Sequence, residues 1–387
     1  MDADRYPSSP FGRARRTPGA HGYIAYFPAP IPRTIELPPS TQRLLADAEA
    51  WLGRLAGVGQ SIANPYLLIR PYLLREALAS TRIEGTRTTM AELFAAEAGD
   101  APNADVEEVT NYVAALEWGL TELERLPLSV RLLRELHSRL MAGVRGRERM
   151  PGDLRTTQNW IGAANSTIET ARFVPPPPGE LAALLRDWEL FANEEPETPL
   201  LVQNALLHAQ FETIHPFLDG NGRLGRLLLV FFLIHRGRLP APLLYLSAYL
   251  ERHRRHYYDA LDAIREKGDA IPWVEMFLTA VETQSRDAVA RAQQIIEVRS
   301  RYLQATASMT TTNGLALVEL ICENPRMTTR QVEERMSVSR PTALRLLRQL
   351  ADRGVLTEDD PGPRGQRRYV ARELMDAVAD EGTQSSG

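Results

Sequence analysis

The feature that most constrains this chain is a polar, glycine-containing segment, His215 to Arg226, that separates two strongly apolar stretches. The stretches at 199–213 and 223–236 have the length and composition of buried helices. Between them, the nine positions from His215 to Arg223 hold an imidazole, a carboxylate, two glycines, an amide and a guanidinium. Each of these polar groups would need a hydrogen-bond partner in a core. The segment is therefore poor core material, and we interpret it as a loop that faces a ligand.

The residue types in this loop suit a phosphate group. Gly220 and Gly222 allow backbone N–H groups to approach an anion closely, and the helix that starts near Arg223 directs its positive end to the same place. Asp219 is a hard oxygen ligand of the kind that Mg²⁺ shares with phosphates. Arg223 and Arg226 are three residues apart, so they lie on one face of the first helical turn. Two cations are unfavourable at a helix N-terminus unless a polyanion neutralises them, which favours a polyanionic ligand.

Outside this loop, apolar residues recur at three- and four-residue spacing along most of the chain, the pattern of amphipathic helices. The stretch 158–178 is the exception, because β-branched and aromatic residues surround an Ala-Ala-Asn-Ser turn and four prolines close it. This stretch predicts a short hairpin or ordered flap. The predicted fold is therefore mainly α with one β-hairpin flap. Helices are predicted from Thr41 onward and over 71–82, 104–124, 128–143, 179–192, 199–213, 223–236, 250–267 and 271–295.

The C-terminal part of the chain has a different pattern. Helical stretches at 314–323, 328–336 and 340–353 precede two short strands around a Gly/Pro-rich tip, which is the order of a small winged helix-turn-helix domain. Eleven arginines and only six acidic residues lie between Asn324 and Arg372, in a chain whose net charge is −4. This local positive charge suits phosphate contacts along a DNA groove. Winged helices also serve as protein-docking or dimerisation modules, so both kinds of partner stay open.

These patterns divide the chain into regions. The first forty residues are rich in proline, glycine and arginine, and we predict a poorly structured arm whose aromatic residues pack on the main body. A threonine-rich stretch, Thr306 to Asn313, predicts a linker before the winged helix. The predicted regions are an arm (1–40), an N-terminal helical region (41–127), a helical core (128–295), a linker (296–312), the winged helix domain (313–377) and a disordered tail (378–387).

Composition excludes several classes of protein. Hydrophobic residues make up 44% and charged residues 24% of the 387-residue chain, as in ordinary globular proteins. The single cysteine, Cys322, excludes a disulfide framework and a cysteine-rich metal site, and it favours a reducing environment. The most apolar run, Leu227 to Ile234, is too short to span a bilayer, and the N-terminus lacks the pattern of a signal peptide. We therefore expect a cytoplasmic protein with no membrane partner.

The segment HPFLDGNGRLGR resembles the signature HxFx(D/E)GN(G/K)RxxR of the Fic (Fic/DOC) family, and every constrained position is filled. The resemblance covers roughly residues 20–290, and a C-terminal winged helix is also common in that family. It implies a Fic-type helical core and a protein adenylyltransferase, which transfers AMP from ATP to a Ser, Thr or Tyr hydroxyl of a target protein. The other stretches that resemble Fic proteins are LHSRLMAGVRG (136–146), PGDLRTTQNWIG (151–162), FVPPPP (173–178) and YLSAYLERHRRHYYDAL (245–261).

The resemblance also implies roles for individual residues. His215 would be the general base that activates the target hydroxyl, and Asp219 would bind the Mg²⁺ that bridges the α- and β-phosphates of ATP. Phe217 would anchor the loop in the core, and the flap at 160–175 would pair with a target segment as an added strand. The residues expected to bind the nucleotide are Gly220, Asn221, Gly222, Arg223, Leu224, Gly225 and Arg226, with Tyr257 and Tyr258 at the adenine or, alternatively, in the core.

A second short motif, STRIEG from Ser80 to Gly85, resembles the (S/T)xxxE(G/N) inhibitory motif of many Fic proteins. Ser80, Glu84 and Gly85 occupy its defining positions. A glutamate at the end of a helix could form a bidentate ion pair with Arg226. That pair would occupy the guanidinium that the γ-phosphate needs, so ATP would bind in a non-productive pose. The alternative is that Glu84 is an exposed acid before a helix-ending glycine.

Two other functions stay open at this point. A nucleotide-sensing transcription regulator would bind DNA through the winged helix, but it would have no need for a general base at His215. A Fic enzyme could instead remove AMP or transfer another phosphate-linked group, because the motif forms a phosphate site and does not specify the base. Self-modification and a homodimer are compatible with the sequence. The target protein and the event that relieves inhibition are not specified by it.

Overall fold

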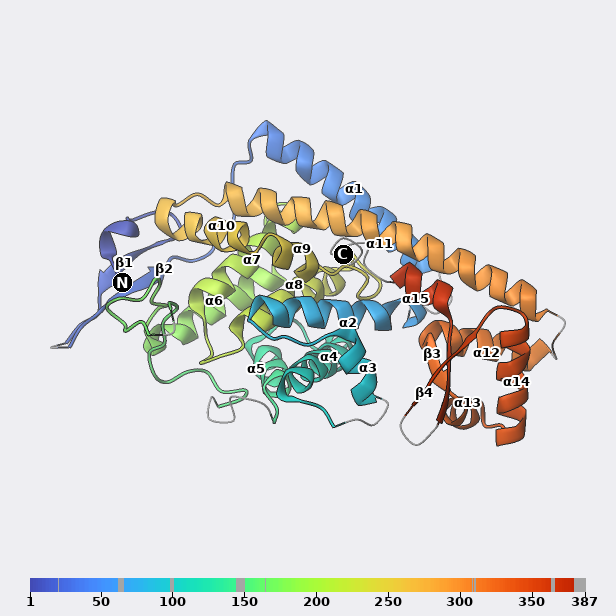
Figure 1. Ribbon diagram of the computed structural model, residues 1–387. Helices are drawn as coiled ribbons and strands as arrows, with labels where there is room; N and C mark the ends of the chain where they lie inside the picture. Colours follow the sequence, from blue (N-terminus) through green and yellow to red (C-terminus); the bar gives the residue numbers. More distant parts are fainter. Residues whose placement is uncertain are drawn as a thin grey trace, which may run out of the picture. The chain divides into compact units, whose positions relative to one another are not determined.

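The computed structural model describes residues 1–19, 21–61, 66–97, 101–143, 150–163, 165–307, 309, 311–362 and 366–378. Within these residues the chain is mainly helical, as predicted, and it divides into two compact units (Figure 1). Unit 1 comprises Met1–Ala56 and Leu74–Ser285, and unit 2 comprises Gly57–Leu73 and Arg286–Gly387. Among the described helices, none combines the length and the apolar character needed to cross a membrane.

The core of unit 1 is built around α7 (Leu200–Ile214) and α8 (Asn221–His235). Every residue of α7 after Leu200 is buried, and so is most of α8. A helix that is buried on all sides has to lie inside the fold. α6 (Leu181–Asn193) packs on α7, whereas α4 (Ala104–Leu123) and α5 (Val130–Leu140) pack on α8. The loop that joins α7 to α8 is therefore held between two elements that the core fixes.

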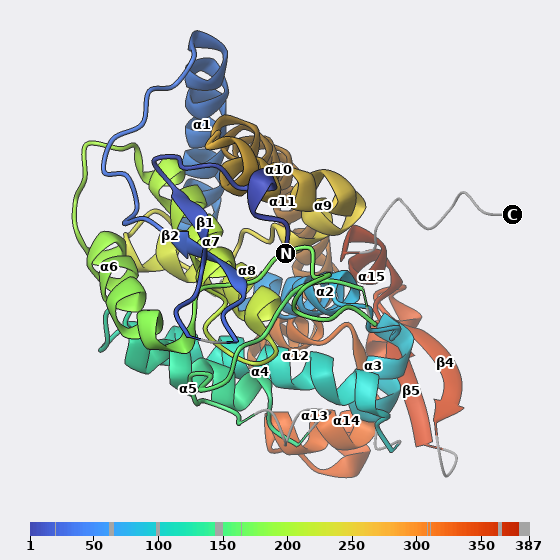
Figure 2. The same cartoon turned by 90° about the vertical axis from the view of Figure 1, so that its left-hand side faces the viewer.

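The other helices of unit 1 enclose this central pair. α4 begins after Asn103, whose side chain accepts a hydrogen bond from the Val106 N–H, and α5 begins after Ser129, which caps Leu132 in the same way. Figure 2 shows α7 and α8 between α10 on one side and α4 and α5 on the other. The helices that lie wholly or partly in unit 1 also include α1 (Pro39–Ser61), α2 (Tyr66–Ile83), α3 (Met90–Glu97), α9 (Ser247–Arg252), α10 (Arg254–Lys267) and α11 (Ile271–Thr306).

The N-terminal arm has regular structure, so the prediction of a poorly structured arm over 1–40 is wrong. Strands β1 (Gly12–Arg16) and β2 (Ile24–Pro28) pair antiparallel. The rings of Tyr6, Tyr26 and Phe173 form a cluster with centroid distances of 5.7–6.0 Å, so the aromatic residues of the arm do pack on the body. The composition of the arm did not predict this structure, because the partner that orders it lies far away in the sequence.

The predicted flap is an ordered loop with a very short hairpin base. Ile161 and Phe173 form one antiparallel bridge, with N–H···O distances of 2.8 and 3.0 Å. The next residue, Val174, accepts a hydrogen bond of 2.9 Å from the Tyr26 N–H of the arm. The arm therefore holds one side of the flap. Residue 164, within the flap, lies outside the described residues.

Unit 2 contains the predicted winged helix domain. Its helices are α12 (Thr311–Glu323), α13 (Thr329–Met336) and α14 (Arg340–Asp352), and its three strands pair antiparallel in the order β3-β5-β4. Thr328 and Gln331 form a capping box that starts α13. The strands are β3 (Arg326–Thr328), β4 (Thr357–Gly362) and β5 (Gln366–Val370), and α15 (Arg372–Val378) follows them.

Element boundaries differ from the prediction in several places. The linker expected over 296–312 is wrong over 296–306 and 311–312, because α11 continues to Thr306 and buries apolar side chains along its length, and α12 begins at Thr311. The single helix predicted over 250–267 is two helices, α9 and α10, which meet at His253. Helices α3 and α15 were not predicted. The tail predicted over 378–387 lies, after its first residue, outside the described residues.

Candidate active site

The loop between α7 and α8 has a fixed shape. His215 ends α7 in the left-handed conformation, with φ 48° and ψ 61°, and its N–H donates to the Phe211 carbonyl at 2.9 Å. Gly220 is also left-handed, with φ 73°, and directly precedes α8. The buried Asn221 side chain closes the loop, because its Oδ1 accepts from the Phe217 N–H and its Nδ2 donates to the Phe217 carbonyl, both at 2.9 Å. The Asn221 amide is thus used inside the loop, and its backbone N–H is the part available to an anion.

His137 supports the loop from α5, and the sequence interpretation missed it. Its ring stacks on the buried Phe217 ring at 3.8 Å with an interplanar angle of 9°. Nδ1 accepts a hydrogen bond of 2.9 Å from the Gly152 N–H, so the ring proton is on Nε2, which donates to the Asp219 carbonyl at 3.0 Å. Burial lowers the pKa of His137 to about 4, which keeps the ring neutral. The histidine lies on the apolar face of its helix, where sequence alone gives no sign of these contacts.

Asp219 lies beside the N-terminus of α8. Its Oδ1 accepts a hydrogen bond of 2.7 Å from the Gly220 N–H, and its side chain is 46% exposed. The carboxylate is therefore open to solvent at the positive end of a helix. Among the residues that the structure describes, no three metal-ligating side chains converge. A Mg²⁺ ion held by Asp219 would therefore take its other ligands from phosphate oxygens and water, as this ion commonly does.

The two arginines of α8 are buried and engaged with different partners. The side chain of Arg223 is 7% exposed, and its Nη1 lies 3.3 Å from the Glu108 carboxylate. Its Nη2 contacts the Met141 sulfur at 3.3 Å, whereas its Nε is buried without a hydrogen-bond partner. The side chain of Arg226 is 1% exposed and contacts the end of α2. The sequence placed both cations on one helical face correctly, but it did not predict the acidic partner Glu108.

Ser80 and Glu84 of the STRIEG motif both contact Arg226. Nη2 of Arg226 donates to Glu84 Oε1 at 2.8 Å and to the Ser80 carbonyl at 2.8 Å, and Nε donates to the Ser80 hydroxyl at 3.0 Å. The predicted bidentate pairing is therefore wrong in detail, because Nη2 donates to Glu84, whereas Nε donates to the Ser80 hydroxyl. Gly85 follows with φ 102°, a left-handed conformation that ends the helical segment. α2 begins at Tyr66, earlier than the predicted start at 71.

The charges at this contact favour the ionised pair. Burial is the largest single effect and raises the pKa of the Glu84 carboxyl, but the charge and the hydrogen bond of Arg226, together with the charge of Arg223, outweigh it, so the pKa lies below its usual value. The Glu84 side chain is nevertheless 37% exposed. A β-carbon on Gly222 would lie 2.3 Å from Glu84 Oε1, so a side chain at position 222 would require the end of the Glu84 side chain to shift. The contact is close, and solvent reaches its acidic partner.

The His215 imidazole is in its neutral form. Burial and, to a smaller extent, the positive charges of Arg155 and Arg265 lower its pKa to about 4, whereas the negative charge of Glu84 opposes them. Its Nδ1 is buried without a hydrogen-bond partner. A neutral imidazole has a lone pair that can take a proton, which a base requires.

Several residues expected at the nucleotide lie in the packing of the core. Leu224 is fully buried, and the Gly225 carbonyl accepts a hydrogen bond of 3.1 Å from His208 Nδ1. Tyr257 is 1% exposed, and its hydroxyl donates to His208 Nε2 at 2.8 Å. Tyr258 is half-buried beside the Arg254 guanidinium, 5.8 Å from the ring centroid. For Tyr257 the structure therefore shows the core environment that was the alternative interpretation.

Two further buried groups near the loop were missed by the sequence interpretation. Burial raises the pKa of the Glu212 carboxyl on α7 to about 7, and its Oε1 has no hydrogen-bond partner. Arg155 is 2% exposed and donates to carbonyls of the loop. Neither residue could be found from the sequence, because a lone Glu or Arg near apolar residues is normally predicted to be a surface charge.

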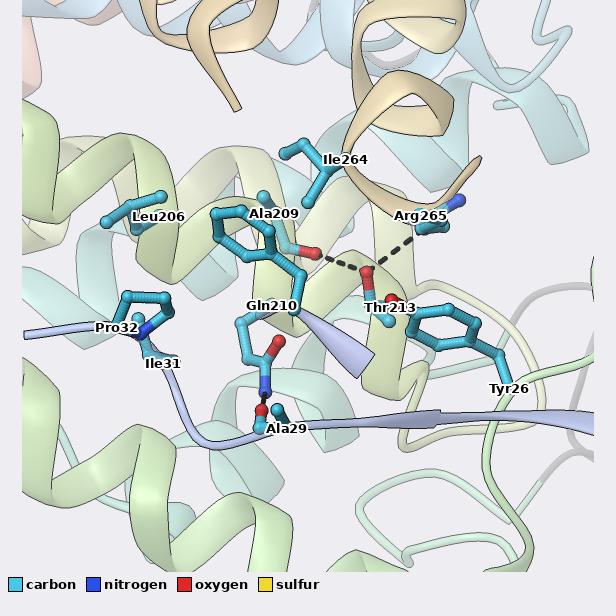
Figure 3. A pocket seen from close by; sticks show the side chains of 11 residues that line it. Tyr26, Ala29, Ile31, Pro32, Leu206, Ala209, Gln210, Thr213, Ile264 and Arg265 are labelled. Atoms are coloured by element: carbon cyan, nitrogen blue, oxygen red, sulfur yellow. Dashed lines mark hydrogen bonds between the residues drawn. The ribbon is translucent and has the colours of Figure 1, made fainter. Parts of the chain in front are cut away.

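A pocket elsewhere in unit 1 is lined by Tyr26, Gln210 and Thr213, among others, and by no residue of the 215–226 motif (Figure 3).

Models of known protein families match the part of the chain that contains this loop. The Fic/DOC family N-terminal model matches residues 42–121, and the Fic/DOC family model matches residues 127–233. The chain belongs to the Fic/DOC family. Residues 310–360 of this Fic protein also match the IclR helix-turn-helix domain.

The relatives of this Fic protein include curated and structurally solved proteins. It is 31% identical over 211 residues to Protein adenylyltransferase Fic of Drosophila grimshawi, covering 52% of this chain and 40% of that protein. The Drosophila willistoni protein of the same name is 28% identical over 249 residues, covering 62% of this chain and 46% of that protein. The chain thus spans less than half the length of the curated relatives it matches.

Solved structures show the same fold. A Fic family protein from Desulfovibrio desulfuricans superposes with a TM-score of 0.58 at 23% identity, covering 87% of this chain and 97% of that one. Fic-1 of C. elegans, residues 134–508, superposes with a TM-score of 0.50 at 20% identity, covering 67% of this chain and 73% of that one.

Proposed function

We propose that this protein is an adenylyltransferase that transfers AMP from ATP to a hydroxyl of a target protein. The observation that carries the proposal is the buried His215 imidazole, whose Nδ1 has no hydrogen-bond partner and which shares one internally hydrogen-bonded loop with the N-terminus of α8. A protein that only senses a nucleotide needs the anion site but not the base. The names of the Drosophila relatives support the same reaction class.

The reaction would proceed by a single displacement. His215 takes the proton of a Ser, Thr or Tyr hydroxyl, and the hydroxyl oxygen forms a bond to the α-phosphorus of ATP. The bond from that phosphorus to the oxygen bridging the α- and β-phosphates breaks, and pyrophosphate leaves. The N–H groups at residues 220–222 stabilise the charge on the phosphate oxygens, and Arg223 and Arg226 hold the outer phosphates. Mg²⁺, held by Asp219, would supply further positive charge to the phosphates.

We further propose that Glu84 restrains this reaction. The Arg226 guanidinium is almost completely buried and already donates to Glu84 and Ser80. A γ-phosphate that binds Arg226 has to displace the Glu84 carboxylate, or else bind elsewhere in a non-productive pose. The 37% exposure of the Glu84 side chain supports displacement, because solvent can receive the released carboxylate.

The flap is proposed to bind the target. An edge with unpaired backbone groups can accept an extended peptide as an added strand. Such pairing reads the target backbone more than its side chains, which is consistent with a sequence that does not specify one target residue.

A second binding function, for duplex DNA, is proposed for the winged helix domain. Arg340, Arg345 and Arg348 of α14 are exposed, and within the described residues none of them forms an ion pair. Free guanidinium groups along one helix suit phosphate contacts, and the match to an IclR helix-turn-helix domain favours this partner. A protein-docking role is the alternative outcome.

The test of the enzyme is incorporation of labelled AMP from labelled ATP in a lysate. The Glu84→Gly variant is expected to modify proteins faster than the wild type. Adding His215→Ala is expected to reduce the rate by about 100- to 10,000-fold, the usual contribution of a general base. Mass spectrometry of the modified proteins separates an AMP adduct from another phosphate-linked group, and it also detects modification of the chain itself. Transfer that survives His215→Ala would remove the proposed base.

A further inference from the structure

Arg155 is a buried cation without an acidic partner. Its side chain is among the largest fully buried ones in the described chain, and burial lowers its pKa to about 10. Within the described residues it forms no ion pair, and its Nη1 is buried without a hydrogen-bond partner. A buried guanidinium is costly unless other groups compensate its charge. The hydrogen bonds of Arg155 therefore show which part of the molecule its buried charge stabilises.

All the hydrogen bonds of Arg155 go to backbone carbonyls, and three of these carbonyls are consecutive. Nη2 donates to Ile214 at 3.2 Å and Nε donates to His215 at 2.9 Å. The backbone N–H of Arg155 donates to Pro216 at 3.0 Å. The C-terminus of a helix has unpaired carbonyls and a partial negative charge, so a cation is favourable there. Arg155 thus terminates α7 from outside the helix.

The residue at this helix end is strained. His215 is a non-glycine residue at φ 48°, where glycine usually ends a helix. Such a conformation persists only where the surroundings fix it from several sides. The carbonyls before, at and after the strained residue are all bound by Arg155, so this one side chain and its own backbone fix the peptide planes around the imidazole.

The same residue connects the loop to the flap. Nη2 of Arg155 donates to the Pro176 carbonyl at 2.6 Å, at the end of the flap. Nearby residues repeat the pattern, because Gln158 Nε2 donates to the Pro175 carbonyl at 3.0 Å and Asn159 Nδ2 donates to the Phe217 carbonyl at 3.0 Å. The segment 155–159 therefore binds the flap end on one side and the 214–217 backbone on the other.

We propose that Arg155 is a positioning residue for His215, which holds the imidazole-bearing residue in its left-handed conformation, places a fixed positive charge beside it and ties it to the flap. The proposal rests on the proposed role of His215 as the base. Arg265 on α10 adds a second positive charge, and Glu84 adds a negative one. Glu212, one turn earlier on α7, is the other titratable group near the imidazole, and burial favours its neutral form. The net field of the fixed charges therefore favours an unprotonated base.

Two variants separate the geometric role from the charge. Arg155→Lys keeps the charge but cannot donate to three carbonyls in a planar arrangement. Arg155→Gln removes the charge. Both are made in the full-length Glu84→Gly chain, with Arg236→Lys as the matched control. Arg236 also donates to backbone carbonyls, those of Ala192 and Glu194, but at the end of α6, away from the loop. Thermal unfolding shows which variants fold.

The first readout needs no activity. Histidine side chains are labelled with ¹³C, and the His215 signal, one of seven, is identified by its loss in His215→Ala. In Arg155→Gln the midpoint of its titration is expected to rise by about one pH unit, as for removal of a nearby charge. In Arg155→Lys and Arg236→Lys it is expected to stay at the parent value. An unchanged midpoint in a folded Arg155→Gln chain overturns the electrostatic part of the proposal.

The second readout is AMP transfer. Arg155→Lys is expected to lower kcat by about 10- to 100-fold, because a misplaced catalytic group costs that much, with KM for ATP nearly unchanged. Arg236→Lys is expected to leave both values unchanged. Parent-like kcat in Arg155→Lys overturns the positioning role, and this result decides the matter even if Arg155→Gln does not fold. If the parent chain itself transfers no AMP, the proposed function fails, while the His215 titration still tests Arg155.

Discussion

Two groups of arginines in this protein, both proposed to bind phosphates, have opposite surroundings. On α8, the side chains of Arg223 and Arg226 are 7% and 1% exposed, and both already contact a carboxylate. On α14, Arg340, Arg345 and Arg348 are exposed and, within the described residues, form no ion pair. A phosphate that binds the α8 arginines as proposed would have to replace a carboxylate of the protein, so its binding would compete with an ion pair inside the protein. A ligand of α14 would displace only counterions, so its binding would be controlled by salt.

The largest expected effect tests the arginines of α8. Arg226→Gln in the Glu84→Gly chain is expected to reduce AMP transfer by about 100- to 1000-fold, because it removes a positive group that holds the phosphates. Initial rates with labelled ATP measure the loss. Arg236→Gln, near the other end of α8, is the matched control and should retain the parent rate. If Arg226→Gln retains the parent rate, the buried arginine has no role in transfer.

The next effect separates the two partners of Arg226. Glu84→Gly is expected to raise the transfer rate of the wild-type chain by about 10- to 100-fold, since it removes a hydrogen bond between charged groups. Ser80→Ala removes only the hydroxyl that accepts from Nε, and a few-fold rise is expected. Rates of both variants at saturating ATP make the comparison. An increase with Ser80→Ala that exceeds the one with Glu84→Gly would show that the hydroxyl, not the carboxylate, restrains the enzyme.

A smaller effect is expected at the exposed arginines of α14. Arg345→Ala in the full-length chain should weaken duplex DNA binding and reduce the slope of affinity against salt by about one. Fluorescence anisotropy at several salt concentrations measures this slope. Arg330→Ala is the matched control, because Arg330 is exposed but pairs with Glu334 at 2.7 Å. Equal losses in the two variants would mean that free and paired arginines do not differ, and no binding at low salt would favour the protein-docking alternative.

The smallest effect concerns Glu212, a buried acid on α7 whose Oε1 has no hydrogen-bond partner. Its pKa is about 7 in the folded chain and near its ordinary value of 4.5 in the unfolded chain. Between these pH values the folded chain holds the extra proton, so this group's contribution to stability is present below pH 4.5 and is lost as the pH rises through 7. Glu212→Gln does not titrate. It should therefore be more stable than the wild type at pH 8 by about 2–4 °C in Tm, with a smaller difference at pH 5. A difference in Tm between the two proteins that is the same at both pH values would contradict the raised pKa of Glu212.

The sequence predicts much of this site because the motif is local. The residues from 215 to 226 are adjacent in the chain, so the sequence alone predicts a loop that starts at His215, directly after α7, and two arginines in the first turns of α8. The helical periodicity predicts most helices for the same reason. The STRIEG contact was predicted only through resemblance, because Ser80 is 146 residues away from Arg226.

The parts that the sequence did not predict depend on distant partners. The arm over 1–40 has a composition typical of disorder, yet the Phe173 side chain orders it through Tyr6 and Tyr26. Arg155 and His137 act through backbone carbonyls, and a carbonyl has no identity in the sequence. For Tyr257 the sequence left both core packing and contact with the adenine open, because an aromatic residue has the same helical spacing in a core and in a pocket. The hydrogen bond to His208 shows that Tyr257 lies in the core.

The missing side chain of Gly222 would give the proposed restraint by Glu84 a second point of control. A methyl group there would meet Glu84 Oε1 at 2.3 Å, and the end of a flexible glutamate can move aside at little cost. Position 222 has ordinary helical backbone, so larger residues add volume without backbone strain. Alanine, serine and larger residues at 222 would then weaken the Glu84 contact in steps. If Glu84 restrains transfer as proposed, the restraint would accordingly be graded, and the volume of the residue at position 222, within the 215–226 motif, would adjust it.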